Sequence, residues 1–320
     1  MKNLFSNLRG DLFGGITAGV VALPLALAFG VSSGLGPTAG LYGAIFLSFF
    51  AALFGGTQTQ ISGPTAPMTA VSMVVIAGIL AINDGDVEKA LPSILLVFLL
   101  AGLMQIILGI LGLGRYIRYI PYPVISGFMT AIGLIIILTQ ILPGILVLED
   151  FKETIARSQE ITESAIQLEA QTLAGSAASG VLGTFKALPR AVRNISWIEL
   201  LLCLVTIGII YGFARVTTSI PSTLAALLLV SVAAHLLKLD YRPIEEIPQG
   251  LPLPEWRVFT EINMTTVTAH VFTALTLALL GAIDSLLTSV VADNMTKTRH
   301  KPNRELIGQG IGNSIAAVFG

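Results

Sequence analysis

Apolar runs of about 20 residues recur along this chain of 320 residues and restrict its fold more than any other feature. As an α-helix, a run of that length crosses a hydrocarbon core roughly 30 Å thick. Only 12% of the residues are charged, against roughly 25% in a typical soluble domain. The sequence therefore predicts an all-α polytopic membrane protein held in the lipid bilayer, and we expect no nucleic acid among its partners.

Hydropathy predicts nine membrane spans and one long connection. The spans cover residues 12–31, 38–54, 61–82, 90–112, 122–142, 196–214, 220–237, 268–292 and 305–319. The connection, 144–195, is interpreted as an extracellular loop that begins with an amphipathic helix or as a mobile insertion. Basic residues are densest between 297 and 304. Because basic loops stay on the inner side, we predict a cytoplasmic N-terminus in the cell's inner (plasma) membrane.

The stretch of residues 60–71, at the start of the third expected span, contains two prolines. Pro64 and Pro67 each lack the N–H that a helix interior needs, and each disfavours helical geometry in the preceding residue. The pattern predicts an extended segment and then a helix starting at Pro67, with Thr65 or Ala66 near its cap. A helix that starts inside the bilayer directs backbone N–H groups and its positive dipole end at a cavity, which attracts an anion. A simple kink is the alternative.

The first span carries small residues at helical spacing, which permit close approach of a neighbouring helix. They are Gly15, Gly19, Ala22, Ala26 and Gly30. Pro24 lies midway along this span. It predicts either a second stretch of broken backbone near the midplane or a packed, kinked helix.

Asp284 is the one acidic residue deep within an expected span. Such residues usually face the protein interior and mark ion or proton paths. Thr288 and Gly281 share its helix stripe, and a carboxylate beside a hydroxyl offers the oxygen ligands that a small cation prefers. A structural salt bridge is the alternative. An intramembrane aspartyl protease would need Asp293 as the partner of Asp284, but nine residues of helix put the two on opposite sides. We therefore expect no enzyme.

The second and ninth expected spans end in similar short sequences. Residues 51–56 read AALFGG and residues 316–320 read AAVFG. If these spans are equivalent, the repeat unit has seven helices, and an odd number inverts the second copy in the membrane. This predicts that the sequence is truncated before a second broken span that would face residues 60–71.

Three motifs together identify a resemblance. Residues 15–24 (GITAGVVALP), 34–42 (GLGPTAGLY) and 63–67 (GPTAP) resemble, in order and spacing, the sulfate permease (SulP) family of anion transporters. The resemblance covers the whole chain and implies fourteen spans in two inverted seven-helix repeats, with core and gate domains. It also implies a cytoplasmic STAS domain after the last span, through which members form homodimers. Within the family the chain is most similar to cyanobacterial sodium-dependent bicarbonate transporters.

The resemblance also implies two ion sites. The anion site would be formed by residues at the start of the third span: Thr65, Ala66, Pro67, Met68, Thr69 and Ala70. Leu25 and Phe29 would wall it, although many relatives have glutamine at the position of Leu25. Asp284, Thr288 and Gly281 would hold sodium as the coupling ion, with no other metal or cofactor.

These expectations combine into one function. We expect a sodium-coupled symporter of a small inorganic anion, bicarbonate before others, that works by alternating access. The alternative is a proton-coupled transporter of sulfate or another inorganic anion with the same fold. The expected parts are residues 1–143 (spans 1–5), 144–195 (the loop), 196–267 (spans 6–7 and an outer loop) and 268–320 (the start of the second repeat).

Overall fold

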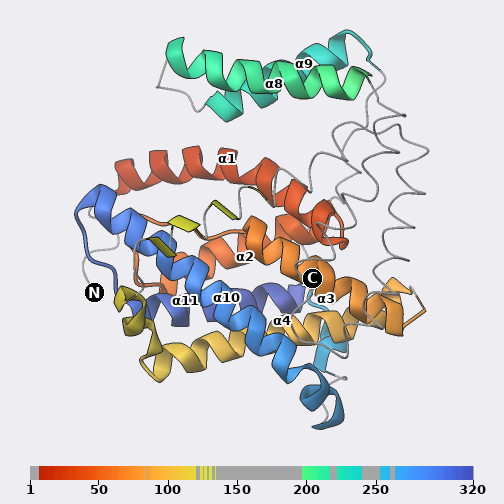
Figure 1. Ribbon diagram of the computed structural model, residues 1–320, viewed down its shortest axis with the longest axis vertical. Helices are drawn as coiled ribbons and strands as arrows, with labels where there is room; N and C mark the ends of the chain where they lie inside the picture. Colours follow the sequence, from red (N-terminus) through yellow and green to blue (C-terminus); the bar gives the residue numbers. More distant parts are fainter. Residues whose placement is uncertain are drawn as a thin grey trace. The chain divides into compact units, whose positions relative to one another are not determined.

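A computed structural model describes residues 7–84, 86–119, 123–124, 126–127, 130–131, 134, 197–216, 222–239, 253–259 and 264–319. Within these ranges the regular structure is helical (Figure 1). The α-helices are α1 (Leu8–Ser33), α2 (Pro37–Phe54), α3 (Ala66–Ile82), α4 (Val87–Ile110), α8 (Trp197–Val216), α9 (Ser222–Leu236), α10 (Met264–Thr296) and α11 (Pro302–Phe319). Two short 3-10 helices are η1 (Leu113–Tyr119) and η2 (Trp256–Phe259). The expected fifth span is described only in isolated residues, and 144–195 lies outside the described residues.

The chain divides into two compact units. The first comprises Met1–Leu25 and Ile135–Ile244, where α8 and α9 lie side by side (Figure 1). The second comprises Ala26–Leu134 and Glu245–Gly320 and contains the end of α1 together with α2, α3, α4, α10 and α11. All of the interactions described below belong to this second unit.

The described helices agree with the sequence prediction at most boundaries. The break at residues 60–71 is present: α3 begins at Ala66, Thr65 is its N-cap, and residues 55–65 contain no helix. The prediction of broken backbone at Pro24 is wrong, because α1 continues through that residue. One proline removes a single hydrogen bond, and membrane helices accommodate such a loss.

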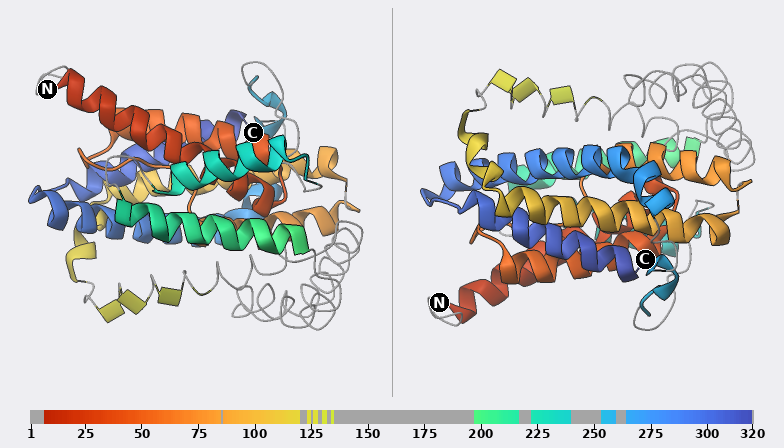
Figure 2. Two further views of the ribbon diagram at one scale, coloured as in Figure 1. Left: turned by 90° about the horizontal axis from the view of Figure 1, so that it is seen from above. Right: turned by 90° about the horizontal axis from the view of Figure 1, so that it is seen from below.

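Helix α4 forms the centre of the second unit. One face of α4 packs with α3 and α10 in an apolar cluster that includes Ile76, Ile94 and Leu277. Another face packs with η2 and α11 through Leu96, which is fully buried, and its neighbours. Figure 2 shows α4 between α10 and α11. These contacts hold together helices that are far apart in the sequence.

Glycines allow two close helix contacts. A Cβ added to Gly310 of α11 would lie 2.6 Å from the carbonyl oxygen of Gly102 in α4. A Cβ on Gly40 of α2 would lie 2.0 Å from the carbonyl oxygen of Ala26 in α1. The second contact confirms the expected close helix approach for the small residues near the C-terminal end of α1. Nearer its N-terminal end, Gly15 and Gly19 face open space.

Four described helices are long and apolar enough to cross a membrane: α1, α2, α4 and the Thr266–Thr296 part of α10. Helices α3, α8 and α9 are apolar but shorter. Helix α11 occupies the expected ninth span, yet its composition does not mark it as one. Its buried face includes Glu305 and Gln309, which make polar contacts inside the protein.

Candidate anion and cation site

The N-terminus of α3 is an open helix end. Thr65 has extended backbone (φ −124°, ψ 151°), and its side chain makes no capping bond to α3. The first bond of the helical pattern runs from the N–H of Thr69 to the carbonyl of Thr65 at 2.9 Å. The N–H groups of Ala66 and Met68 lie before that bond and so have no acceptor within the helix, and Pro67 has no N–H group. Two N–H donors and the positive end of the helix dipole therefore point out of the first turn.

Thr65 uses its hydroxyl in a different way. Its Oγ1 donates a hydrogen bond of 2.7 Å to Oδ2 of Asp284, across 219 residues of sequence. Asp284 lies on α10 with only 8% of its surface exposed. Among the residues that the structure describes, its other oxygen, Oδ1, receives no hydrogen bond. The contact joins the residue that caps the broken helix to the predicted cation ligand.

The other two predicted sodium ligands lie within one turn of Asp284. Thr288 donates its hydroxyl proton to the backbone carbonyl of Asp284 at 2.9 Å, so its oxygen lone pairs remain free to bind a cation. Gly281 lies on the other side of Asp284 along α10. A Cβ at Gly281 would be 2.6 Å from Nε2 of Gln105 in α4 and 3.5 Å from the sulfur of Met68, so this glycine faces both α4 and the first turn of α3. The structure thus brings a predicted sodium residue next to a predicted anion residue.

Thr69 lies in the first turns of α3, and its place in the anion site stays a prediction. Its hydroxyl donates to the carbonyl of Thr65 at 2.9 Å, as does its own N–H. Both of its donor hydrogens therefore serve the helix, and an anion at this helix end would rely on backbone N–H groups. Ala70 lies one residue further along α3. Phe29 is half-buried in the second unit, whereas Leu25 belongs to the first unit, so its predicted place beside the anion stays a prediction.

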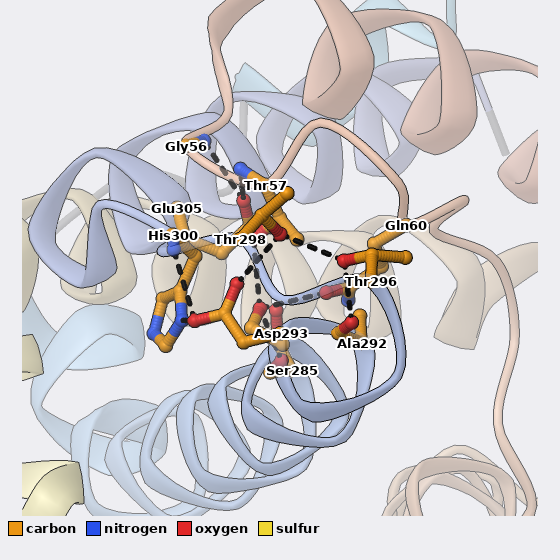
Figure 3. A network of polar contacts seen from close by, with 11 residues as sticks. Gly56, Thr57, Gln60, Ser285, Ala292, Asp293, Thr296, Thr298, His300 and Glu305 are labelled. Atoms are coloured by element: carbon orange, nitrogen blue, oxygen red, sulfur yellow. Dashed lines mark hydrogen bonds and ion pairs between the residues drawn. The ribbon is translucent and has the colours of Figure 1, made fainter.

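Sequence reasoning missed a set of polar contacts that hold the connection from α2 to α3. We call residues 55–65 the linker. Residues at both of its ends, and residues between them, contact α10 or α11. Figure 3 shows the contacts near Gly56, Thr57 and Gln60. Ser289 of α10 donates to Oε1 of Gln60 at 2.7 Å and lies 2.9 Å from Oγ1 of Thr57. Glu305 of α11 accepts from the backbone of Gly56 at 2.8 Å. In the sequence, these contacts are indicated only by the polar residues within α11, a segment whose length otherwise fits a short membrane span.

Asp293 and His300 form a further polar contact, between α10 and the turn that leads to α11. The His300 side chain is only 8% exposed, and its Nδ1 lies 2.6 Å from Oδ2 of Asp293 (Figure 3). That oxygen also accepts the backbone N–H of His300 at 3.0 Å. The pair closes the turn between α10 and α11. Since Asp284 bonds to Thr65 instead, the two aspartates do not form a protease dyad.

Comparison with known proteins decides the family. The model of the sulfate permease family matches residues 8–320. The chain belongs to the sulfate permease family. It is 44% identical over 284 residues to "Bicarbonate transporter BicA" from Synechocystis sp., a match that covers 87% of this chain and 44% of the relative. It is 31% identical to "Putative sulfate transporter YvdB" from Bacillus subtilis, covering 87% of this chain and 46% of that one.

A solved structure supports the same fold. The transmembrane domain of a cyanobacterial bicarbonate transporter BicA superposes with a TM-score of 0.79 and 42% identity, covering 99% of this chain and 73% of that one. The sulfate permease chain is therefore a multi-pass, all-helical membrane protein of a transporter family, and not an enzyme. It spans about half the length of the curated relatives it matches.

Proposed function

We propose that the chain is part of a sodium-coupled symporter of a small inorganic anion, with bicarbonate as the anion. The observation that carries this proposal is the 2.7 Å hydrogen bond from Thr65 to Asp284. It connects the helix end that would hold the anion to the carboxylate that would hold the cation. The similarity to transporters named for bicarbonate supports the choice of anion.

The anion would bind at the N-terminus of α3. The N–H groups of Ala66 and Met68 and the positive dipole end of α3 would stabilise its negative charge. A backbone site of this kind suits bicarbonate, which offers several oxygen acceptors. Phe29 and Leu25 would wall the site, as the family resemblance implies.

Sodium would bind at Asp284. Oδ1 of Asp284, the hydroxyl oxygen of Thr288 and a backbone carbonyl near Gly281 offer the hard oxygen ligands that sodium accepts. A bound sodium ion would cancel the charge of a carboxylate that otherwise repels an anion at the end of α3. Each ion would then raise the affinity of the other by the same factor.

The remaining architecture is proposed from the family and from one internal likeness. Helices α2 and α11 both have 18 residues, begin with proline and end with phenylalanine. They also pack against each other, and the ring of Phe46 in the middle of α2 stacks on that of Phe319 at the end of α11, with 4.1 Å between ring centroids. This supports two inverted seven-helix repeats, divided between a core and a gate domain that alternate access. A cytoplasmic N-terminus, the inner membrane and dimerisation through a STAS domain belong to the same proposal.

Uptake measurements test the proposal directly. Protein reconstituted in liposomes is given labelled bicarbonate or labelled sulfate, in sodium or in choline medium. We expect bicarbonate uptake that falls to background when choline replaces sodium. Equal uptake in both media would rule out sodium coupling.

A second candidate is a proton-coupled transporter of sulfate. The 31% identity to a putative sulfate transporter favours it, and the N–H donors of α3 would serve sulfate as well as bicarbonate. Sulfate uptake that follows a proton gradient in choline medium would establish this candidate in place of the first.

A further inference from the structure

Glu305 is a buried carboxylate whose partners are backbone groups of the linker. It is 2% exposed. Its Oε2 accepts the N–H of Gly56 at 2.8 Å and the N–H of Thr57 at 2.9 Å (Figure 3). Hydrogen bonds to a carboxylate are stronger than neutral ones, and a buried one left unmade is costly. The start of the linker is therefore fixed to the first turn of α11.

Gln309 extends this contact along the linker. Its Nε2 donates to Oε1 of Glu305 at 3.0 Å and also to Oγ of Ser62. Gln309 lies one helical turn after Glu305 on α11 and is 6% exposed. Ser62 is three residues before Thr65. One glutamine thus joins the carboxylate that holds the start of the linker to the residue that leads into α3.

Gly56 shows how closely the linker fits against the turn before α11. Its carbonyl accepts the N–H of Lys301 at 3.0 Å, while its own N–H donates to Glu305. A Cβ at this position would lie 2.2 Å from the carbonyl oxygen of Lys301. The neighbouring Arg304 donates from Nε to the carbonyl of Phe54 at 3.1 Å. Gly56 is thus held through both its N–H and its carbonyl, and the start of the linker has little room to shift.

We propose that Glu305 and Gln309 are positioning residues of the anion site, which set where α3 begins. The inference rests on the proposed function. The linker has no secondary structure of its own, so its course depends on these contacts. A shift at Ser62 would pass through three residues to Thr65, and it would move both the N–H donors of α3 and the hydroxyl that bonds to Asp284.

The contact between Glu305 and Gln309 can be broken and rebuilt by exchanging donor and acceptor. Gln309→Glu places two carboxylates face to face and removes the donor to Ser62. Adding Glu305→Gln restores the pairing: the amide oxygen at 305 accepts from Gly56 and Thr57, and its nitrogen donates to the carboxylate at 309. The hydroxyl of Ser62 can then donate to that same carboxylate. The double variant has the same net charge as the wild type.

We expect Gln309→Glu to raise the KM for labelled bicarbonate about tenfold, with a smaller change in maximal rate, as for one lost buried hydrogen bond. The double variant should return to within about threefold of the wild type. Ser62→Ala removes only the last contact and should raise KM by about threefold. A merely structural role would lower the yield of folded protein and leave KM unchanged.

Amide hydrogen exchange of residues 55–62 in the same reconstituted proteins provides a readout that does not need transport. We expect faster exchange in Gln309→Glu and wild-type exchange in the double variant. Wild-type KM in Gln309→Glu, or a double variant with KM no lower than that of the single variant, would overturn the inference. If the wild type takes up no bicarbonate, the proposed function fails, and the exchange of residues 55–62 alone decides whether Glu305 and Gln309 hold the linker.

Discussion

Asp284 and Glu305 are two buried carboxylates that contact the same linker, and they are satisfied in different ways. Glu305 receives three donors, two of them backbone N–H groups. Asp284 receives one, from the hydroxyl of Thr65, and its Oδ1 has no donor among the described residues. A carboxylate bound by several fixed donors suits a structural contact that stays in place. A carboxylate with one free oxygen and a single rotatable donor suits reversible binding of a ligand.

The largest effect is expected from Asp284→Ala. Removing this carboxylate should abolish sodium-dependent bicarbonate uptake, because the proposed cation site loses its only charge. The protein should remain folded, since Asp284 makes one side-chain hydrogen bond to the rest of the unit. Uptake in liposomes, with size-exclusion chromatography as the folding control, checks both points. Retained sodium dependence would show that Asp284 does not bind the cation, and the proposed difference in role between Asp284 and Glu305 would then be wrong.

Thr65→Val tests the single hydrogen-bond donor of Asp284, the hydroxyl of Thr65. Valine has the shape of threonine without the hydroxyl, so the link between α3 and Asp284 disappears while the packing remains. We expect the factor by which sodium lowers the KM for bicarbonate to shrink by about tenfold, the value of one hydrogen bond to a charged group. Thr65→Ser keeps the hydroxyl and should keep the factor. An unchanged factor in Thr65→Val would show that the ions are coupled by another route.

A steric change tests the joint near Glu305. In Gly308→Ala, the new Cβ would lie 2.4 Å from the backbone nitrogen of Gly55, which forces α11 and the linker apart. Overpacking of this kind costs about 1 to 3 kcal/mol, so thermal unfolding should occur at a lower temperature. Gly43→Ala in α2 is the matched control, because no atom lies within 4 Å of its added Cβ. Equal unfolding temperatures for the two variants would contradict the tight fit.

The smallest effect is expected at an exposed carboxylate, Asp86, which caps α4. It accepts the N–H of Lys89 at 3.2 Å, and this bond, with the Lys89 side chain, lowers the pKa of Asp86. Its stabilising effect is therefore present above the ordinary aspartate pKa and is lost as pH falls through the lower folded value. Asp86→Ala should lower the unfolding temperature slightly at pH 7 and leave uptake unchanged. Asp86→Asn should keep the cap and lose its pH dependence.

The sequence predicted most of the described helices, and it singled out the start of α3 and Asp284 as candidate site residues, because these signals are local. Apolar runs located α1 to α4 and α8 to α11 to within a few residues, and the two prolines predicted a helix start next to Thr65. Asp284 stood out because acidic residues are rare in spans. Each of these inferences needed only neighbouring residues.

What the sequence did not predict depends on contacts between distant segments. Nothing near Thr65 indicates that its hydroxyl reaches Asp284 rather than an anion, and nothing near Glu305 indicates that it holds Gly56. At Pro24 the sequence left two alternatives open, and the structure has the continuous helix: the local helix-breaking signal was outweighed. Nothing in the sequence near His300 indicates that the turn places its side chain against Asp293.

The contact between Gly56 and Glu305 also sets an order of events during synthesis. The two residues are 249 apart in sequence. At the usual translation rate of about 5 to 20 residues per second, α11 leaves the ribosome roughly 12 to 50 s after the linker does. Until then the first residues of the linker lack the carboxylate that binds their N–H groups. The proposed anion-binding end of α3 is thus expected to reach its final position only after α11 has been synthesised, when the membrane already holds most of the helices described here.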